Sequence, residues 1–203
     1  MILFDSIEIT QSQKMNIGSL PWKIDNLKDL NVLIGPNGTG KTTIMGILSE
    51  ASEKNKWLKQ YHGSVKYTRH EGVIGSINCY KLFYKNLVRP RDSFDSYNDS
   101  FFGALDVVND WKSSGERAMT QIDDIETVKG SIILIDEMDA SFDWNNQVEY
   151  FNKIKHLAVH NQIFIATHSL IFCSLAKVLY DTKQRIWTTY NDVKNKYFPE
   201  VAL

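Results

Sequence analysis

Leu30-Asn31-Val32-Leu33-Ile34-Gly35-Pro36-Asn37-Gly38-Thr39-Gly40-Lys41-Thr42-Thr43 is the stretch that decides the fold of this chain. Its first five residues form an almost continuous apolar run, as in a central strand that is covered on both faces. After Lys41, apolar residues recur at helical spacing: Ile44, Ile47, Leu48 and Ala51. The segment Gly35–Thr42 matches G-x-x-x-x-G-K-S/T in the strand–loop–helix setting that this motif requires. The stretch therefore predicts a phosphate-binding loop.

The chemistry of this loop follows from its residue types. Glycines let the backbone curl so that N–H groups point inward at phosphate oxygens, and the positive end of the following helix adds to the same spot. Lys41 would reach the β- and γ-phosphates, and the Thr42 hydroxyl would ligate Mg²⁺. The alternative is a glycine-rich turn with a chance lysine, but the flanking strand and helix argue against it. We expect a nucleoside triphosphate and Mg²⁺ along Gly35–Thr43.

An acidic pair follows a second buried run, Ile132–Ile135. A carboxylate at the carboxyl end of a buried strand can reach Mg²⁺ beside a phosphate loop, so Asp136 is the predicted metal ligand. Glu137 points differently and would polarise the attacking water as a general base. The alternative interpretation, an acidic cap at the start of a helix, is weakened by the phosphate loop upstream.

Ser113-Ser114-Gly115-Glu116 is a third element, placed between the first two. Small residues and a glycine at a helix N-terminus can form an anion site. The same string is also a good helix cap, in which Glu116 completes a capping box. In isolation the two interpretations stay open.

Together and in this order, these motifs resemble the ABC-type ATPase superfamily. Ser113–Glu116 looks like its signature motif, in the form typical of the small stand-alone ATPases of the RecF, SMC and OLD-like branch. Asp136–Asp143 is similar to the Walker B segment followed by the D-loop. Ala166–Ser169 resembles the switch segment, with His168 as the switch histidine. The motifs span roughly Leu30 to Ser169.

This resemblance implies a function. The nucleotide would be ATP, hydrolysed with Mg²⁺, and His168 would sense the γ-phosphate. Two copies, or this chain and a related ATPase subunit, would pack head to tail. Each ATP would lie between Gly35–Thr42 of one chain and Ser113–Glu116 of the other, with Asp143 close by. Such a dimer stays closed only while the γ-phosphate is present.

The sequence departs from the family pattern at the glutamine that usually follows an early strand of the sheet. Ser76–Tyr84 contains none, and Asn78, Lys81 or Asn86 would have to replace it. Met138 stands where many members have proline, and Lys112 replaces an apolar residue. These departures predict slow hydrolysis or dependence on a partner. Trp22 is a candidate for stacking on the base, although the sequence does not single out one aromatic residue.

Composition is that of an ordinary globular protein. The 203 residues fit one domain, and the net charge of −1 gives no global attraction to nucleic acid or anionic membrane. No apolar run is long enough to cross a bilayer, and residues 1–10 lack the features of a signal peptide. Cys79 and Cys173 have no metal-ligand spacing around them, and we expect both to be buried thiols in a reducing compartment. We expect a cytoplasmic location.

Apolar strands alternating with helices predict an α/β fold of the P-loop NTPase kind, with a mainly parallel sheet flanked by helices and a small helical insertion at about residues 76–129. The predicted strands are Ile2–Thr10, Trp22–Ile24, Leu30–Ile34, Val65–Thr68, Ser76–Tyr84, Ser131–Ile135, Gln162–Ala166 and Arg185–Thr189. The predicted helices start near Lys41 and Val148 or cover Phe101–Trp111, Glu116–Lys129 and Leu170–Val178.

Three outputs for the ATPase remain open. The first is a role in DNA repair or maintenance, or in a phage-defence-like system, supported by cations interleaved with aromatic residues at positions 54–69. Such a run is also typical of a solvated helix face. The second is a regulatory module that controls a separate soluble effector. The third, less favoured, is the ATP-binding subunit of a membrane transporter.

Overall fold

A six-stranded sheet forms the centre of the molecule in the computed structural model, which describes residues 1–12, 20–52, 64–74, 77–83 and 113–197. The strand order is β5-β6-β7-β3-β8-β9, and all neighbours are parallel except β8 and β9. The strands are β5 (Cys79–Phe83), β6 (Ile132–Asp136), β7 (Gln162–Ala166), β3 (Leu30–Ile34), β8 (Val178–Asp181) and β9 (Ile186–Thr189).

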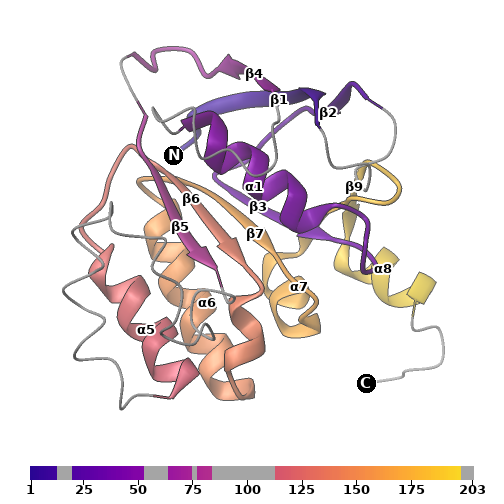
Figure 1. The fold of residues 1–203 in the computed structure, drawn as a ribbon. Coiled ribbons are helices and arrows are strands. Elements are labelled where there is room, and N and C mark those ends of the chain that lie inside the picture. The colour runs from indigo at the N-terminus through magenta and orange to yellow at the C-terminus, as the bar shows by residue number, and fades with distance from the viewer. Residues whose placement is uncertain (13–19, 53–63, 75–76, 84–112, 198–203) are drawn as a thin grey trace, which may run out of the picture.

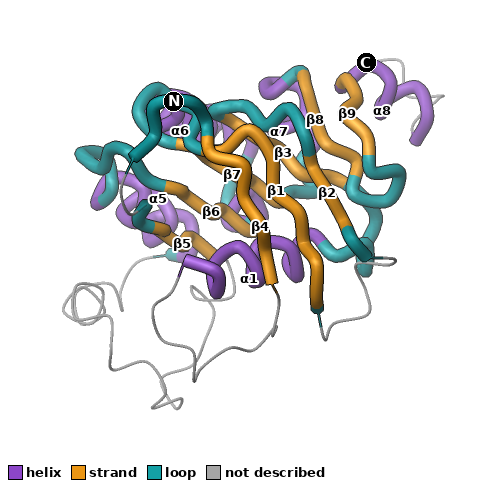
Figure 2. Tube along the Cα trace, turned by 90° about the horizontal axis from the view of Figure 1, so that it is seen from above, coloured by secondary structure: helices purple, strands orange, loops and turns teal. Residues whose placement is uncertain are grey.

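A smaller antiparallel sheet, in the order β2-β1-β4, lies over one end of the molecule (Figures 1 and 2). Its strands are β1 (Phe4–Gln11), β2 (Trp22–Ile24) and β4 (Ser64–Arg69). Helix α1 (Lys41–Ser52) lies between this sheet and the central one. Apolar residues of β1, β2 and α1 share one buried cluster with Leu33, Leu134 and Phe164 of the central sheet. The small sheet and α1 therefore cover one face of the central sheet.

The opposite face of the central sheet is covered by helices from the second half of the chain (Figure 1). They are α5 (Ser114–Asp124), α6 (Trp144–Ala158), α7 (Leu170–Ala176) and α8 (Tyr190–Tyr197), with a 3₁₀ turn, η3 (Met138–Ser141), before α6. Tyr150, Phe151 and Ile154 of α6 are fully buried against this face. Because β3, β6 and β7 are covered on both sides, their sequences are almost continuously apolar.

The parallel arrangement decides where the predicted site residues gather. In register, Ile135 pairs with Ile165, and Leu33 pairs with Ala166. The phosphate loop follows β3, the acidic pair ends β6, and the His168 segment follows β7. Because these strands are parallel and in register, the three segments lie at the same edge of the sheet. Ligand sites of open α/β sheets lie at this carboxyl edge.

The predicted fold class is confirmed at the level of a mixed α/β structure with a mainly parallel sheet flanked by helices. The helical insertion at 76–129 needs correction, because its start is the strand β5, which pairs with β6 in the central sheet. The helix predicted at Phe101–Trp111 lies outside the described residues. The helix predicted at Glu116–Lys129 starts at Ser114 and ends at Asp124.

Two elements near the C-terminus differ from the prediction. The helix predicted to reach Val178 ends at Ala176, because Lys177 adopts a positive φ of 64° and breaks it. Val178–Asp181 is instead the strand β8, beside β3, and the sequence analysis missed both it and α8. A four-residue strand carries too few residues to show a period. None of the described helices is long and apolar enough to cross a membrane.

Candidate functional site

The phosphate loop is a tight turn held by its own backbone and by a distant threonine. Three of its residues, Gly35, Gly38 and Gly40, have φ values of 143°, 79° and 91°. Residues other than glycine rarely adopt such backbone angles. At Gly35 space is also short, because a Cβ would lie 2.5 Å from the Thr182 hydroxyl. The loop therefore needs glycine at its first position for two independent reasons.

The ammonium group of Lys41 closes the loop from within. Its Nζ donates hydrogen bonds to the carbonyl oxygens of Gly35 at 2.8 Å and Pro36 at 3.2 Å. The residue is only 5% exposed. Burial lowers the pKa of Lys41, while the carboxylates of Glu137 and Asp136 act in the opposite direction. The lysine is thus a buried cation bonded to backbone carbonyl oxygens of the loop. A bound anion would offset the free-energy cost of its burial.

Thr42 and Asp136 bring a hydroxyl and a carboxylate together across the sheet edge. Thr42 Oγ1 donates to Asp136 Oδ1 at 3.3 Å, although the two residues are 94 positions apart in the chain. Asp136 is 5% exposed. This oxygen pair suits Mg²⁺, which usually takes one or two protein oxygens and completes its shell with phosphate and water. In the described part of the chain no cluster of three or more His, Cys, Asp or Glu offers a fuller cage.

Glu137 and His168 face each other beside this pair. Glu137 adopts a left-handed conformation (φ 56°), and its backbone N–H donates to the Ala166 carbonyl at 2.9 Å. Its Oε1 lies 3.8 Å from His168 Nε2, and both side chains are nearly half exposed. Burial and then the charge of Lys41 lower the pKa of His168, against an opposing effect of Glu137. A neutral imidazole next to a carboxylate is therefore favoured at neutral pH.

Thr182 is a site residue that the sequence analysis missed. It follows β8 and is 4% exposed. Its hydroxyl lies 2.8 Å from both the Ile34 carbonyl and the Thr39 hydroxyl, so it braces the start of the phosphate loop. The signal that could have found it is the apolar run Val178–Tyr180 ending in a polar pair, the pattern that also marks β6 and Asp136.

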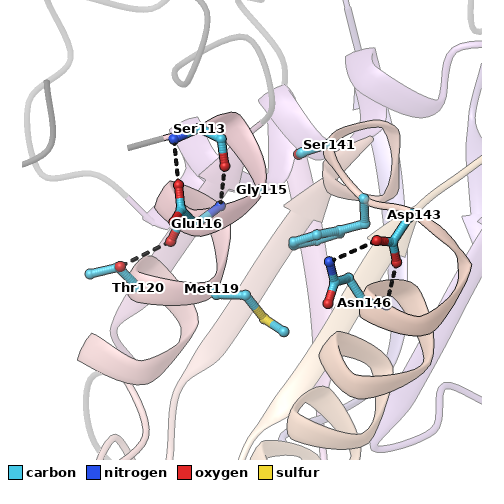
Figure 3. Close-up of a pocket in the computed structure, with 9 residues that line it drawn as sticks. Ser113, Gly115, Glu116, Met119, Thr120, Ser141, Asp143 and Asn146 are labelled. Carbon is cyan, nitrogen blue, oxygen red and sulfur yellow. Dashed lines mark hydrogen bonds between the residues drawn. The ribbon is translucent and has the colours of Figure 1, made fainter. Parts of the chain in front are cut away.

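Ser113, Ser114, Gly115 and Glu116 lie on a different surface, at the start of α5 (Figure 3). Ser113 and Glu116 form a capping box: the Ser113 N–H donates to Glu116 Oε2 at 2.7 Å, and the Glu116 N–H donates to the Ser113 hydroxyl at 3.3 Å. A Cβ on Gly115 would lie 2.9 Å from the Ser141 carbonyl oxygen. Glycine at this position therefore lets α5 approach the turn η3 closely.

A cavity of about 450 Å³ opens between α5, η3 and the start of α6. Asp143 lines it and caps α6, accepting a hydrogen bond from the Asn146 N–H at 2.9 Å (Figure 3). Met119 and Phe142 supply apolar lining, and Ser113 and Glu116 supply polar lining. This cavity is distinct from the phosphate loop, so the predicted site residues fall into two groups on two surfaces.

Other predicted residues are placed as follows. Asn78 precedes β5 and lies about 16 Å from the end of that strand, at the edge opposite Asp136. Lys81 is in the middle of β5, and Asn86 lies outside the described residues. Trp22 is 1% exposed and packs edge-on against Tyr180, so it does not present a face for stacking on a base. Thr43 is buried in the first turn of α1.

No protein-family model matches this sequence, and no curated protein matches it. The fold, in contrast, matches 449 solved chains. One is a bacterial Atm1-family ABC exporter with ATP bound, at a TM-score of 0.50 and 12% identity over 97% of this chain. This chain spans 41% of the exporter chain. At this identity the likeness shows a shared fold alone.

Proposed function

We propose that this protein is an ABC-type ATPase that binds ATP and Mg²⁺, hydrolyses ATP, and acts as an ATP-gated dimer switch. One observation carries the proposal. Five residues from three chain segments, each following a parallel strand, converge at one sheet edge with the chemistry that phosphoryl transfer requires. They are Lys41, Thr42, Asp136, Glu137 and His168.

Each of these side chains has a definite task in the proposed reaction. Lys41 and the backbone N–H groups of the phosphate loop bind and orient the phosphates, and Thr42 and Asp136 would hold Mg²⁺. When bound, the metal ion neutralises charge that develops on the phosphate oxygens. Glu137 orients a water molecule and accepts its proton. His168, kept neutral by burial and by Lys41, can donate a hydrogen bond to a γ-phosphate oxygen.

The second surface supports the dimer part of the proposal. The cavity between α5 and α6 combines a helix N-terminus with small polar groups (Figure 3). Trp144, beside it, is 80% exposed. Ser113, Ser114, Gly115, Glu116 and Asp143 would contact the ATP held by the phosphate loop of a second copy or of a related subunit. Helix N-termini favour phosphate at this position.

The direct test is release of phosphate from ATP by the purified protein. With Mg²⁺ we expect turnover, and with EDTA or in Asp136→Asn we expect it to fall to background. Glu126→Gln, an exposed acidic residue away from the sheet edge, is the matched control and should leave the rate unchanged. An absence of Mg²⁺-dependent turnover, with ATP bound normally, would reduce the proposal to a binding module.

For the pathway, we propose a role in DNA maintenance or in a phage-defence-like system, with control of a soluble effector as the alternative. The cationic stretch offered for DNA is largely outside the described residues, and Tyr67 within it is not available for a base, because it stacks on Phe4 at 4.4 Å. Salt-dependent retention of the protein on duplex or single-stranded DNA tests this role.

A transporter subunit is a second candidate, favoured by the likeness in fold to an exporter. Co-purification with a membrane permease would support it, and co-purification with a soluble protein would support the effector alternative.

A further inference from the structure

The segment that carries His168 is held on both sides by side chains to which no role has been assigned above. On one side is Thr167, which is 1% exposed. Its hydroxyl accepts a hydrogen bond from the Ser169 N–H at 2.9 Å and lies close to the carboxylate of Asp139, in the turn η3. Asp139 follows Glu137 by two positions. The residue before His168 therefore lies against the turn that begins at Glu137.

On the other side of His168, Gln147 makes a second connection. Its Nε2 donates to the carbonyl oxygens of Asp139 and Phe142, both at 3.3 Å, and its Oε1 accepts from the Ser169 hydroxyl. Gln147 belongs to the first turn of α6, the helix that packs against the central sheet. One amide thus joins α6, the turn η3 and the residue after His168.

Asp139 is an unfavourable residue for stability in this position. It is 7% exposed, and burial raises the pKa of its carboxyl group. Its Oδ1 and the hydroxyl of Tyr150 are both buried and lack a hydrogen-bond partner among the described residues. Burying polar atoms in this way opposes folding, and an apolar side chain would avoid the cost. Stability alone therefore does not account for Asp139, whereas its position beside Thr167 is consistent with a role in placing the His168 segment.

We propose that Asp139 and Gln147 are positioning residues that lock the His168 segment to the Glu137 turn, so that the γ-phosphate sensor and the general base move as one unit. The effect of this lock on catalysis rests on the proposed ATPase function. The contacts that form the lock belong to the folded chain and can be tested without nucleotide. The lock acts on His168 through its neighbours Thr167 and Ser169, and it maintains the 3.8 Å approach of the His168 ring to Glu137.

The first test measures the lock without nucleotide. The His168 ring is titrated by NMR in the parent and in Gln147→Leu, with the signal assigned by its loss in His168→Ala. A released His168 segment exposes the ring to water, so we expect its pKa to rise toward the ordinary value of 6.5. Gln121→Leu, the same change on α5, is the matched control and should leave it unchanged. An unchanged His168 titration in Gln147→Leu would overturn the proposal.

A second pair of variants protects against loss of folding in Gln147→Leu. Thr167→Val removes, at almost constant volume, the hydroxyl that accepts from the Ser169 N–H and lies beside Asp139, and Thr167→Ser keeps it. We expect the His168 titration to shift in the first and to stay in the second. Equal titrations in the two variants would also overturn the proposal.

Kinetics then test the consequence. In Gln147→Leu we expect kcat to fall roughly 10- to 100-fold with KM unchanged, as for a misplaced catalytic group. Added to His168→Ala, the same change should cost nothing further, because it acts through His168. If the double variant instead lost activity by the product of the two single losses, Gln147 would not act through His168. If the parent does not hydrolyse ATP, the proposed function fails while the NMR titration still decides the lock.

Discussion

The two surfaces that carry the predicted site residues are built in different ways. At the phosphate-loop edge, polar groups far apart in sequence bind one another, as Thr42 and Asp136 do across 94 positions. At the cavity beside α5, the polar groups serve their own helices: Ser113 and Glu116 cap α5, and Asp143 caps α6. The first surface is assembled by the tertiary fold, and the second by bonds that span three residues.

This difference bears on the proposed nucleotide site. At the edge with Lys41, a buried ammonium group bonds to the carbonyl oxygens of Gly35 and Pro36, and the buried carboxylate of Asp136 bonds to Thr42. The cavity beside α5 offers the end of a helix and has no cation among its described lining residues. Under the proposed function, the first surface would therefore supply most of the contacts to phosphate, and the second would complete them.

The largest expected effect tests the first surface. Lys41→Ala removes a buried ammonium group that would otherwise contact phosphate. Charge-assisted bonds of this kind contribute about 3 kcal/mol, so affinity for ATP should fall by more than about 100-fold, and hydrolysis should be lost with it. Isothermal titration calorimetry measures this, with the exposed Lys129→Ala as control. Tight binding retained by Lys41→Ala would show that the phosphates lie elsewhere.

Glu137→Gln separates binding from chemistry at the same edge. The amide cannot accept the proton of the attacking water, so turnover should drop by roughly 10² to 10⁴. ATP affinity should stay near the parent value, because Glu137 is not among the groups assigned to the phosphates. Phosphate-release assays and calorimetry give the two numbers. Parent-like turnover would mean that another residue positions the water.

Ser113→Arg asks whether the second surface needs a partner. In the Glu137→Gln background, light scattering with Mg-ATP should show a doubled mass, and the arginine should prevent it by filling the cavity mouth. Binding to the monomer should be unaffected. Ser113→Ala, which loses only the cap at about 1 kcal/mol, controls for weakening of α5. A normal ATP-dependent dimer in Ser113→Arg would contradict the role in trans.

Thr182→Val tests the brace that the tertiary structure adds to the phosphate loop. The substitution removes the hydroxyl that bonds Ile34 and Thr39 in a buried position, and should lower the free energy of unfolding by about 1–3 kcal/mol. Thr182→Ser keeps the hydroxyl and should cost less. Urea unfolding of the two variants measures the difference. Equal stabilities would show that the hydroxyl contributes nothing to the loop.

The smallest effect concerns pH. Because the folded-state pKa of His168 lies below its ordinary value of 6.5, the unfolded chain binds more protons between the two values. The free energy of unfolding should therefore rise with pH through this window, and this contribution is lost as the pH falls below 6.5. His168→Asn should flatten the rise, and His156→Asn, on the exposed side of α6, should not. Matching pH profiles for parent and His168→Asn would contradict the assignment.

Much of the phosphate-loop edge could be predicted because the strands and the loop that form it have recognisable local sequence patterns. Ile132–Ile135 is a continuous apolar run and Leu30–Ile34 an almost continuous one, as is typical of parallel strands covered on both faces. The residues that follow such strands lie at one edge of the sheet. The roles assigned to Lys41, Asp136 and Glu137 stay predictions. Beyond the motifs, prediction was weaker: Trp22 was considered as a base-stacking residue, but it is buried in the core.

The glycine-rich loop Gly35–Thr42, the strands before it and before Asp136, and the cap at Ser113 could be read from the residues alone, since these features depend on near neighbours in the chain. The pairing of β8 with β3, the contacts of Thr182 with Ile34 and Thr39, and the bond between Gln147 and Ser169 beside His168 became visible only in the folded molecule. Such contacts join positions that have no common period or motif. They follow from which strands pair and which helices cover them, and this is settled by packing across the whole chain.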